Sequence, residues 1–170
     1  PRFFAEDKLL IQSELRQKNK NSDHIIDLSQ YISSEENTKG HLFYNLNKNY
    51  ENDNFDEIEF SIQLEQVSDE TYLKAYKIES PIINNASNLT NSIGVNLVNE
   101  NSSLGTNLDI YEDLSKQDSD KYEYVPNFSF SKILNENNTL YSKGYYKNYN
   151  TNITEKVLNQ YTRYCRVRYP

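Results

Sequence analysis

The chain has 170 residues, of which 36% are hydrophobic, and a formal net charge of −7. This length suffices for one domain with a core, and the acidic balance argues against nucleic acid, whose phosphates call for clustered Lys and Arg. No run approaches the ~18 apolar residues of a transmembrane helix, which excludes a helical membrane protein but not a β-barrel, where only alternate residues face lipid.

Residue types that are rare or missing limit the possibilities further. The four Gly and four Pro are too few for a loop-rich sandwich with tight turns throughout, and the single Cys, Cys165, cannot form an internal disulfide. There is no Met, and the chain opens abruptly with PRFF. We therefore expect a piece of a longer chain without a signal peptide.

The first part of the chain is predicted to form strands joined by polar turns. In residues 8–17, Leu9, Ile11 and Leu15 share one face, opposite Gln12, Glu14 and Arg16. Residues 24–32 follow with a less regular pattern. Residues 41–50 place Leu42, Tyr44, Leu46 and Tyr50 together. The connections, residues 18–23, 33–39 and 51–54, are rich in Asn, Asp, Ser and Lys, which is typical of turns.

Residues 56–67, DEIEFSIQLEQV, show the clearest pattern. Apolar residues take every second position from Ile58 to Leu64, and polar residues fill the gaps. Successive side chains of a strand point to opposite faces, so this segment is predicted to be a strand with one apolar and one charged face. Its length of about a dozen residues exceeds the usual ~5–6 and matches the ~9–11 that cross a bilayer at a tilt.

The second part of the chain continues the pattern. Residues 71–78 are predicted to pair back as a strand after a short turn, and residues 79–92 to be irregular. Strands are then predicted over residues 93–98, 104–111, 122–131 and 139–149. Pro126 cannot donate a ladder hydrogen bond and marks an edge, a bulge or a break. About eight or nine strands in simple sequence predict an all-β fold, an antiparallel up-and-down meander that forms part of a large transmembrane β-barrel.

Aromatic residues near the predicted strand ends suit the same architecture. Tyr44, Tyr50, Phe55 and Tyr72 lie where the aromatic girdle of a membrane barrel would be. The alternative is that Tyr simply favours strands.

No catalytic, cofactor-binding or metal-binding residues are predicted, and the protein is not expected to be an enzyme. His24 and His41 lie in different strands without metal-ligand spacing, so we interpret them as surface or lumen residues. Glu57, Glu59 and Glu65 line one strand face, which indicates a solvated row. Residues 113–120 are acidic but lack the central Gly and final Glu of a calcium-binding EF-hand loop.

Three segments carry a resemblance to a known family. RFFAEDKLLIQSELRQKNKNSDHIIDLS (2–29), KGHLFYNLNKNY (39–50) and KGYYKNYNTNITEKVL (143–158) resemble the C-terminal barrel of LptD, the lipopolysaccharide-assembly outer-membrane protein family. The resemblance covers residues 2–158, as a partial barrel. It implies a cell outer-membrane location and a translocon that inserts lipopolysaccharide into the outer leaflet, with an LptE-like lipoprotein plug and periplasmic bridge proteins as partners.

Two parts of the family pattern are missing. The periplasmic jelly-roll domain and the family's disulfide cysteines have no counterpart, and no functional residue of the family carries over to a position of this chain. Residues 159–170 break the pattern as a basic tail with Arg163, Arg166 and Arg168, which suggests a truncation or frameshift, with a native basic strand as the alternative.

Two other functions fit the pattern of strands. A soluble all-β binding module, such as a sandwich of a secreted or surface protein, would pack the same apolar faces against each other. A β-rich hydrolase acting on surface glycans would rely on the scattered carboxylates. A lipid-facing sheet is favoured by the uniformly large apolar side chains at positions 58, 60, 62 and 64.

Overall fold

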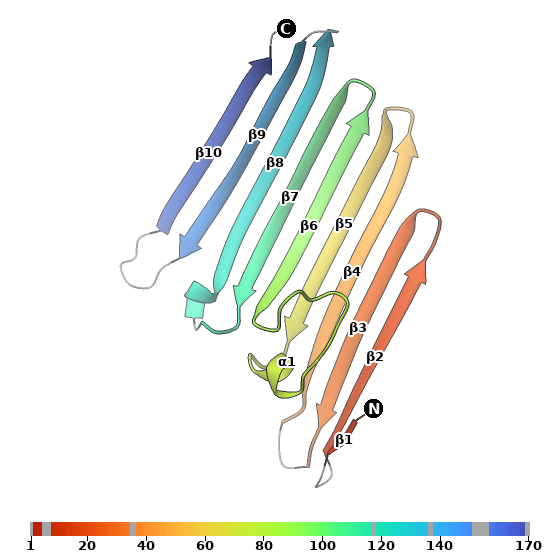
Figure 1. The fold of residues 1–170 in the computed structure, drawn as a ribbon, viewed down its shortest axis with the longest axis vertical. Helices are drawn as coiled ribbons and strands as arrows, with labels where there is room; N and C mark the ends of the chain where they lie inside the picture. Colours follow the sequence, from red (N-terminus) through yellow and green to blue (C-terminus); the bar gives the residue numbers. More distant parts are fainter. Residues whose placement is uncertain are drawn as a thin grey trace.

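A computed structural model describes residues 2–4, 8–34, 37–116, 118–135, 138–150 and 157–168. They form one antiparallel sheet in which every strand pairs with the next along the chain, so that β1 and β10 lie at opposite edges (Figure 1). The predicted all-β meander is confirmed. The strands are β1 (Arg2–Phe4), β2 (Lys8–Lys18), β3 (Ser22–Ile32), β4 (Lys39–Asn52), β5 (Phe55–Val67), β6 (Asn88–Asn99), β7 (Ser102–Asp113), β8 (Tyr122–Asn135), β9 (Asn138–Asn150) and β10 (Val157–Arg168).

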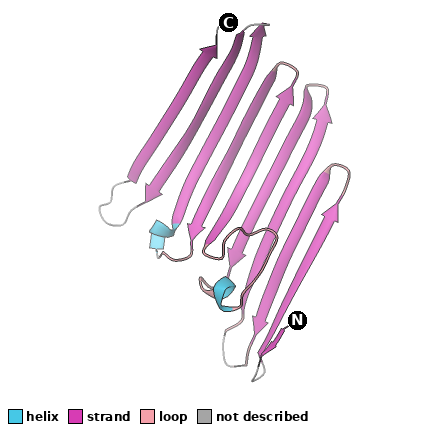
Figure 2. Cartoon of the chain, in the orientation of Figure 1, coloured by secondary structure: helices cyan, strands magenta, loops and turns pink. Residues whose placement is uncertain are grey.

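The prediction of a strand over residues 71–78 is wrong. This stretch contains the short helix α1 (Tyr72–Ala75), part of a connection between β5 and β6 that lies over the sheet (Figure 2). The carboxylate of Asp69 accepts hydrogen bonds from the backbone N–H and the hydroxyl of Thr71, which starts the turn. The turn ends at Lys77, whose φ of 49° is left-handed. The irregular segment is also shorter than predicted, because β6 already begins at Asn88.

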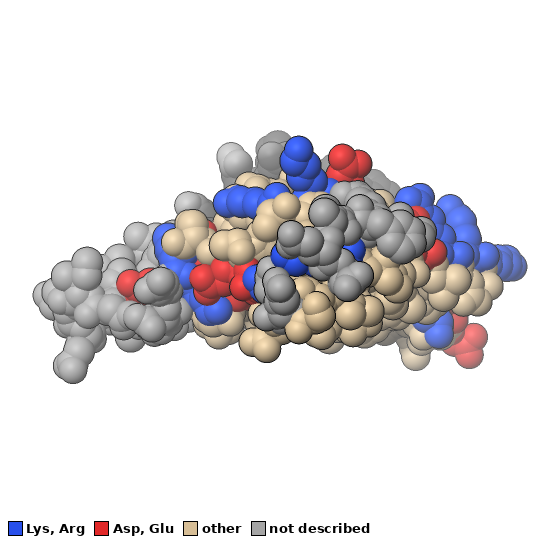
Figure 3. Space-filling view, turned by 90° about the horizontal axis from the view of Figure 1, so that it is seen from below, with Lys and Arg blue, Asp and Glu red and all other residues tan. Residues whose placement is uncertain are grey.

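The predicted faces of the strands are confirmed by the pairing register. Along β4 and β5, Leu42, Tyr44, Leu46 and Tyr50 lie opposite Gln66, Leu64, Ile62 and Ile58. The same face continues through Ile93, Val95 and Leu97 of β6, Leu104, Leu108 and Ile110 of β7, and Tyr124, Phe128 and Phe130 of β8. We call this side the apolar face and the other side the polar face. Viewed from the lower end of Figure 1, the slab has a broad uncharged expanse along one side (Figure 3).

The strands are staggered along their own direction. One transverse row of paired residues runs through Ser22, Lys48, Phe60, Val95, Thr106 and Phe128. Ser22 is the first residue of β3, whereas residues 129–135 still follow Phe128 before β8 ends. The strand ends therefore step upward from β2 to β9 in Figure 1. With ~3.4 Å per residue and ~4.8 Å between strands, the stagger corresponds to a tilt of roughly 45°.

Pro126 lies at a break in one ladder. It pairs with Leu108 of β7, but the pairing of β8 with β9 is interrupted between Tyr124 and Asn127 while the register is kept. This is the break that the missing N–H predicts. Two strands later, β10 pairs with β9 through Arg168 and so continues across residue 158, where the sequence suggested a change. The nature of residues 159–170 stays a prediction.

The packed core lies at one corner of the sheet. Residues 68–87, which we call the covering segment, contact the polar face of β2, β3 and β4. Core side chains come from both layers: Leu10, Tyr31 and Phe43 from the sheet, Tyr72, Leu73, Ile78 and Ile82 from the covering segment, and Leu89 and Leu114 beside them. Within the described residues, no helix is long and apolar enough to cross a membrane.

Candidate functional site

A chain of polar contacts begins and ends on the covering segment. Tyr72 OH lies 2.6 Å from Ser29 Oγ, which lies 2.5 Å from His41 Nδ1. His41 Nε2 lies 3.3 Å from Asp27 Oδ1, which is within ion-pair distance but does not have the geometry of a hydrogen bond. Gln12 then joins the Asp27 carboxylate to the backbone carbonyl of Glu79. The covering segment is thus held at two points by side chains of β2, β3 and β4. We call Gln12, Asp27, Ser29, His41 and Tyr72 together the polar clamp.

The donors of the polar clamp can all point in the same direction along the chain of contacts. The Tyr72 hydroxyl donates to Ser29, the Ser29 hydroxyl donates to Nδ1 of a neutral His41, and the Nε2–H of His41 faces the charged Asp27. Asp27 is fully buried and His41 is 5% exposed. Since buried polar groups are costly unless paired, this arrangement fixes the covering segment on the sheet.

Aromatic packing surrounds the clamp. The His41 ring stacks on Phe43 with the ring centroids 4.2 Å apart, and Tyr76 packs against Tyr31 at 4.5 Å and against Tyr72 at 5.0 Å. The two tyrosine contacts lie within the range of ~4.5–7 Å that stabilises aromatic pairs beyond area burial. Burial raises the pKa of the Tyr72 hydroxyl above its ordinary value.

A second buried carboxylate holds the start of β6. Glu65, 2% exposed, accepts a hydrogen bond from the Thr90 backbone N–H at 2.7 Å and one from Gln63 at 2.6 Å. The Asn91 side chain bonds both backbone groups of Glu65. The polar side chains therefore replace the regular ladder where the chain returns from the covering segment to the sheet.

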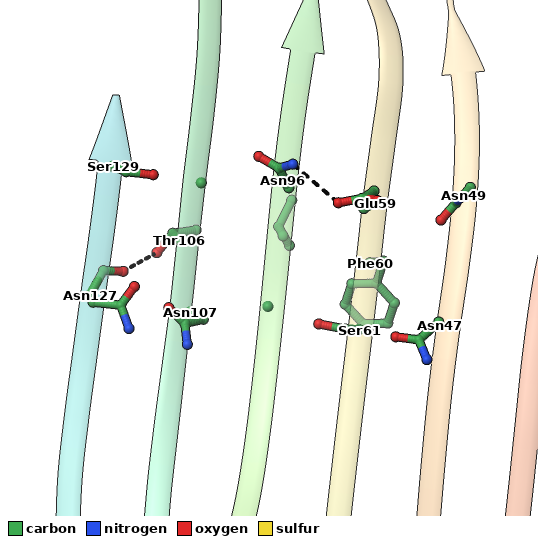
Figure 4. A pocket seen from close by; sticks show the side chains of 13 residues that line it. Asn47, Asn49, Glu59, Phe60, Ser61, Asn96, Thr106, Asn107, Asn127 and Ser129 are labelled. Carbon is green, nitrogen blue, oxygen red and sulfur yellow. Dashed lines mark hydrogen bonds between the residues drawn. The ribbon is translucent and has the colours of Figure 1, made fainter. Parts of the chain in front are cut away.

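The centre of the polar face is a hollow of about 550 Å³. Its walls are amide and hydroxyl side chains of five strands, which include Asn47, Asn96, Asn107, Asn127 and Ser129 (Figure 4). Asn96 donates to the carboxylate of Glu59 at 3.1 Å. Gly94 and Gly105 form part of the floor, and an added Cβ at Gly94 would meet Ser61 Oγ at 2.8 Å. This surface can exchange hydrogen bonds with water or other polar groups, and it carries few charges.

The structure separates the two histidines that the sequence singled out. His24, beside Tyr44, belongs to the apolar face, whereas His41 belongs to the polar clamp. Glu57, Glu59 and Glu65 share the polar face as predicted, but Glu65 is buried rather than solvated. Asp113 binds Ser115 and Lys116. Among the described residues, no three His, Cys, Asp or Glu side chains form a group that could hold a metal ion.

The aromatic residues expected at strand ends are only partly in place. Tyr50 is exposed near the end of β4 on the apolar face. Tyr44 lies nearer the middle of that strand. Phe55, the first residue of β5, lies on the polar face because it is an even number of positions from Glu59. Tyr72 was wrongly assigned to the girdle, since it is fully buried in the polar clamp.

Ser29, His41 and Asp27 are the residue types of a nucleophilic triad, but their setting is that of a structural contact. Ser29 is 6% exposed, and the Tyr72 hydroxyl occupies its other side. A nucleophile needs room for the reacting carbonyl next to Oγ. Here the covering segment fills that space.

No protein-family model matches the chain, and neither does any curated protein or solved structure. The case for function therefore rests on the geometry of the sheet and on the resemblance described above.

Proposed function

We propose that this chain is part of the wall of an outer-membrane β-barrel, a segment of the translocon that inserts lipopolysaccharide into the outer leaflet. The observation that carries the membrane part is an uncharged band on the apolar face. At the apolar-face positions of β2–β8, the Asp, Glu, Lys and Arg residues are Lys48, Asp56, Glu112 and Lys132. Asp56 and Glu112 are next to a terminal residue of their strands, Lys132 is three residues from the end of β8, and Lys48 is four residues from the end of β4.

The band is flanked by polar residues at both ends of the strands. In β5 it extends from Ile58 to Leu64, between Asp56 and Gln66, and in β7 from Leu104 to Ile110, between Ser102 and Glu112. Transmembrane barrel strands of ~9–11 residues carry such a band between polar ends. The stagger of roughly 45° also lies at the upper end of the ~35–45° of barrel strands.

The opposite side of the sheet has the character of a barrel interior. It is rich in Asn, Ser and Glu and has a covering segment folded onto it. Barrel interiors are polar and are often filled by loops. The packed core of the described residues lies on this polar face, so the side chains of the apolar face take little part in it.

A soluble sandwich would require a second layer on the apolar face. Within the described residues, the layer that covers the sheet lies on the polar face instead. Leu15 and Leu64 of the apolar face are 61% and 46% exposed. Lipid acyl chains would cover these side chains without a second layer of protein.

The ends of the strands suggest the orientation of this segment. Connections at one end are short, as at residues 53–54 and 100–101, whereas residues 33–38, 68–87 and 114–121 join the strands at the other end. Outer-membrane barrels have short periplasmic turns and longer extracellular loops. The covering segment would then lie on the extracellular side.

Partition between buffer and lipid vesicles tests the membrane part. We expect the expressed chain to gain β-sheet circular dichroism with vesicles or detergent micelles and to aggregate in buffer, because the sheet has two open edges. A monomeric β-protein that melts cooperatively in plain buffer would contradict the proposal and favour the soluble binding module.

Transport of lipopolysaccharide, and contact with a lipoprotein plug and periplasmic bridge proteins, rest on the resemblance to the LptD family. A photoreactive amino acid in place of Asn107, on the polar face, tests this part in the full-length protein that carries the chain. We expect crosslinks to lipopolysaccharide or to a lipoprotein in cells. Absence of both adducts at Asn107 and at Asn47 would contradict this assignment but leave the membrane barrel intact.

A further inference from the structure

A second hollow, of about 530 Å³, lies at the short-turn end of the sheet. It is lined by the turn after β4 (Asp53, Asn54, Asp56), by the turn between β6 and β7 (Asn99, Glu100, Asn101, Ser102) and by Lys132 of β8. By strand parity, Asp56, Asn99, Ser102 and Lys132 stand on the apolar side of the sheet. The hollow therefore adjoins the uncharged band.

An apolar row borders this hollow directly. Ile58, Leu97, Leu104 and Phe130 lie opposite one another across four strands. The next row toward the turns contains Asn99, Ser102 and Lys132. A row of apolar side chains is thus followed directly by a row of charged and hydrogen-bonding side chains.

The charged side chains of the hollow have no partners among the described residues. Neither an ion pair nor a side-chain hydrogen bond engages Lys132, Asp53, Asp56 or Glu100 there, whereas the amide oxygens of Asn52 and Asn99 are used to hold the two turns. Three carboxylates and one ammonium group of exposed residues therefore face solvent in this hollow.

We propose that this hollow binds the headgroup of a zwitterionic aminophospholipid, an inference that rests on the proposed membrane location. The phosphate lies closest to the acyl chains of such a lipid, and its primary ammonium extends further out. Lys132 and the Ser102 hydroxyl, next to the apolar row, match the phosphate, and the carboxylates of Asp53 and Glu100 in the turns match the ammonium.

The charge balance also selects against anionic lipids. Three carboxylates against one lysine give the hollow a net negative charge, which repels a headgroup that carries only a phosphate. A quaternary ammonium keeps the charge of the ligand but donates no hydrogen bonds to the carboxylates. The hollow should therefore prefer phosphatidylethanolamine to phosphatidylcholine, and phosphatidylcholine to phosphatidylglycerol.

Native mass spectrometry of the chain folded in detergent micelles tests this order. Equal amounts of the three lipids are added, and the bound lipids are counted by mass. We expect phosphatidylethanolamine to exceed phosphatidylglycerol about fivefold, as one favourable charge contact allows. K132E should lower retention of phosphatidylethanolamine by a similar factor, whereas K20E, the same charge change in a turn outside the hollow, should leave it unchanged.

A double variant gives an independent test that does not depend on loss of binding. D53K together with E100K reverses the charge of the turns and should shift the preference to phosphatidylglycerol. Equal retention of the three lipids, equal losses in K132E and K20E, or displacement of lipid by Mg²⁺ at the same carboxylates would overturn the site. Chain that enters vesicles without a headgroup preference overturns this site alone, whereas chain that does not enter lipid overturns the proposed function as well.

Discussion

Leu42 and Phe43 are neighbours in β4, yet Leu42 is 51% exposed and Phe43 is fully buried. Phe43 points to the polar face, where the covering segment of the same chain provides a core, and Leu42 points to the apolar face, which this chain leaves open. The two faces of the sheet are therefore covered in different ways. One corner is packed by protein, and the proposed function assigns the apolar face to lipid.

Arginine on the apolar face should give the largest effect. I62R places a charge within the uncharged band and should cost ~2–4 kcal/mol of membrane stability near the bilayer midplane. Q63R, one position along the same strand but on the polar face, loses only the hydrogen bond to Glu65 and should cost less. Urea titration of the two variants folded into vesicles measures the difference. Equal tolerance would contradict the assignment of the faces, and a severe effect of Q63R alone would reverse it.

Loss of the buried carboxylate should break the protein-packed corner. D27A leaves His41 and Gln12 without their acceptor and should cost about 1–3 kcal/mol. We expect faster hydrogen exchange and earlier proteolysis within residues 68–87, with the β6–β8 ladder unchanged. D23A, in the same strand at an exposed position, is the matched control. Equal exchange in the two variants would show that the polar clamp does not hold the covering segment.

Alkaline pH should loosen the covering segment through Tyr72. Burial raises the pKa of this hydroxyl above its ordinary value of 10.0, so the folded state holds the proton more tightly than the unfolded state does. The stability that the neutral hydroxyl contributes is therefore complete below about pH 10 and is lost as the pH rises further. Proteolysis of residues 68–87 between pH 8 and 11 measures the loss.

The variant Y72F isolates the hydroxyl in that experiment. It removes the hydrogen bond to Ser29, at a cost of about 0.5–1.5 kcal/mol, but keeps the buried ring. The increase in cleavage above pH 10 should be smaller in Y72F than in the unchanged protein. An identical pH profile would assign the alkaline effect to other tyrosines.

Acidic pH should have the smallest effect, at the start of the covering segment. Hydrogen bonds from Thr71, with Lys39 3.5 Å away, lower the pKa of Asp69 below its ordinary value of 3.8. A lowered pKa means that this stabilisation is present above pH ~4 and is lost as the pH falls through the folded-state pKa. Exchange at the N–H of Thr71 should rise in that range, and D69N should remove the pH dependence. The same rise in D69N would contradict the role of this carboxylate.

The faces of the long strands could be predicted because their signal is local. Ile58, Phe60, Ile62 and Leu64 share a side whatever their neighbours are, since the strand period is two residues. The covering segment gave no such signal. A helix of four residues has too few positions to show a period, and Tyr72, Tyr76 and Ile78 would share one face of a strand.

The candidate site was invisible for the same reason. Asp27, Ser29 and His41 each occupy an ordinary polar position of a strand, and nothing in their spacing indicates that residues 72 and 79 close the contacts around them. Glu65 looked like one more solvated carboxylate, and only the return of the chain at Thr90 buries it.

Alternating side chains, polar turns and the lack of clustered basic residues thus determined by themselves that this protein is a meander with one apolar face, because each property is set by neighbours in sequence. Tertiary structure alone decided which corner becomes a core, how far each strand is shifted past the next, and which charged groups meet at the turns. These properties depend on contacts between residues tens of positions apart, which the periodicity of a single strand does not record.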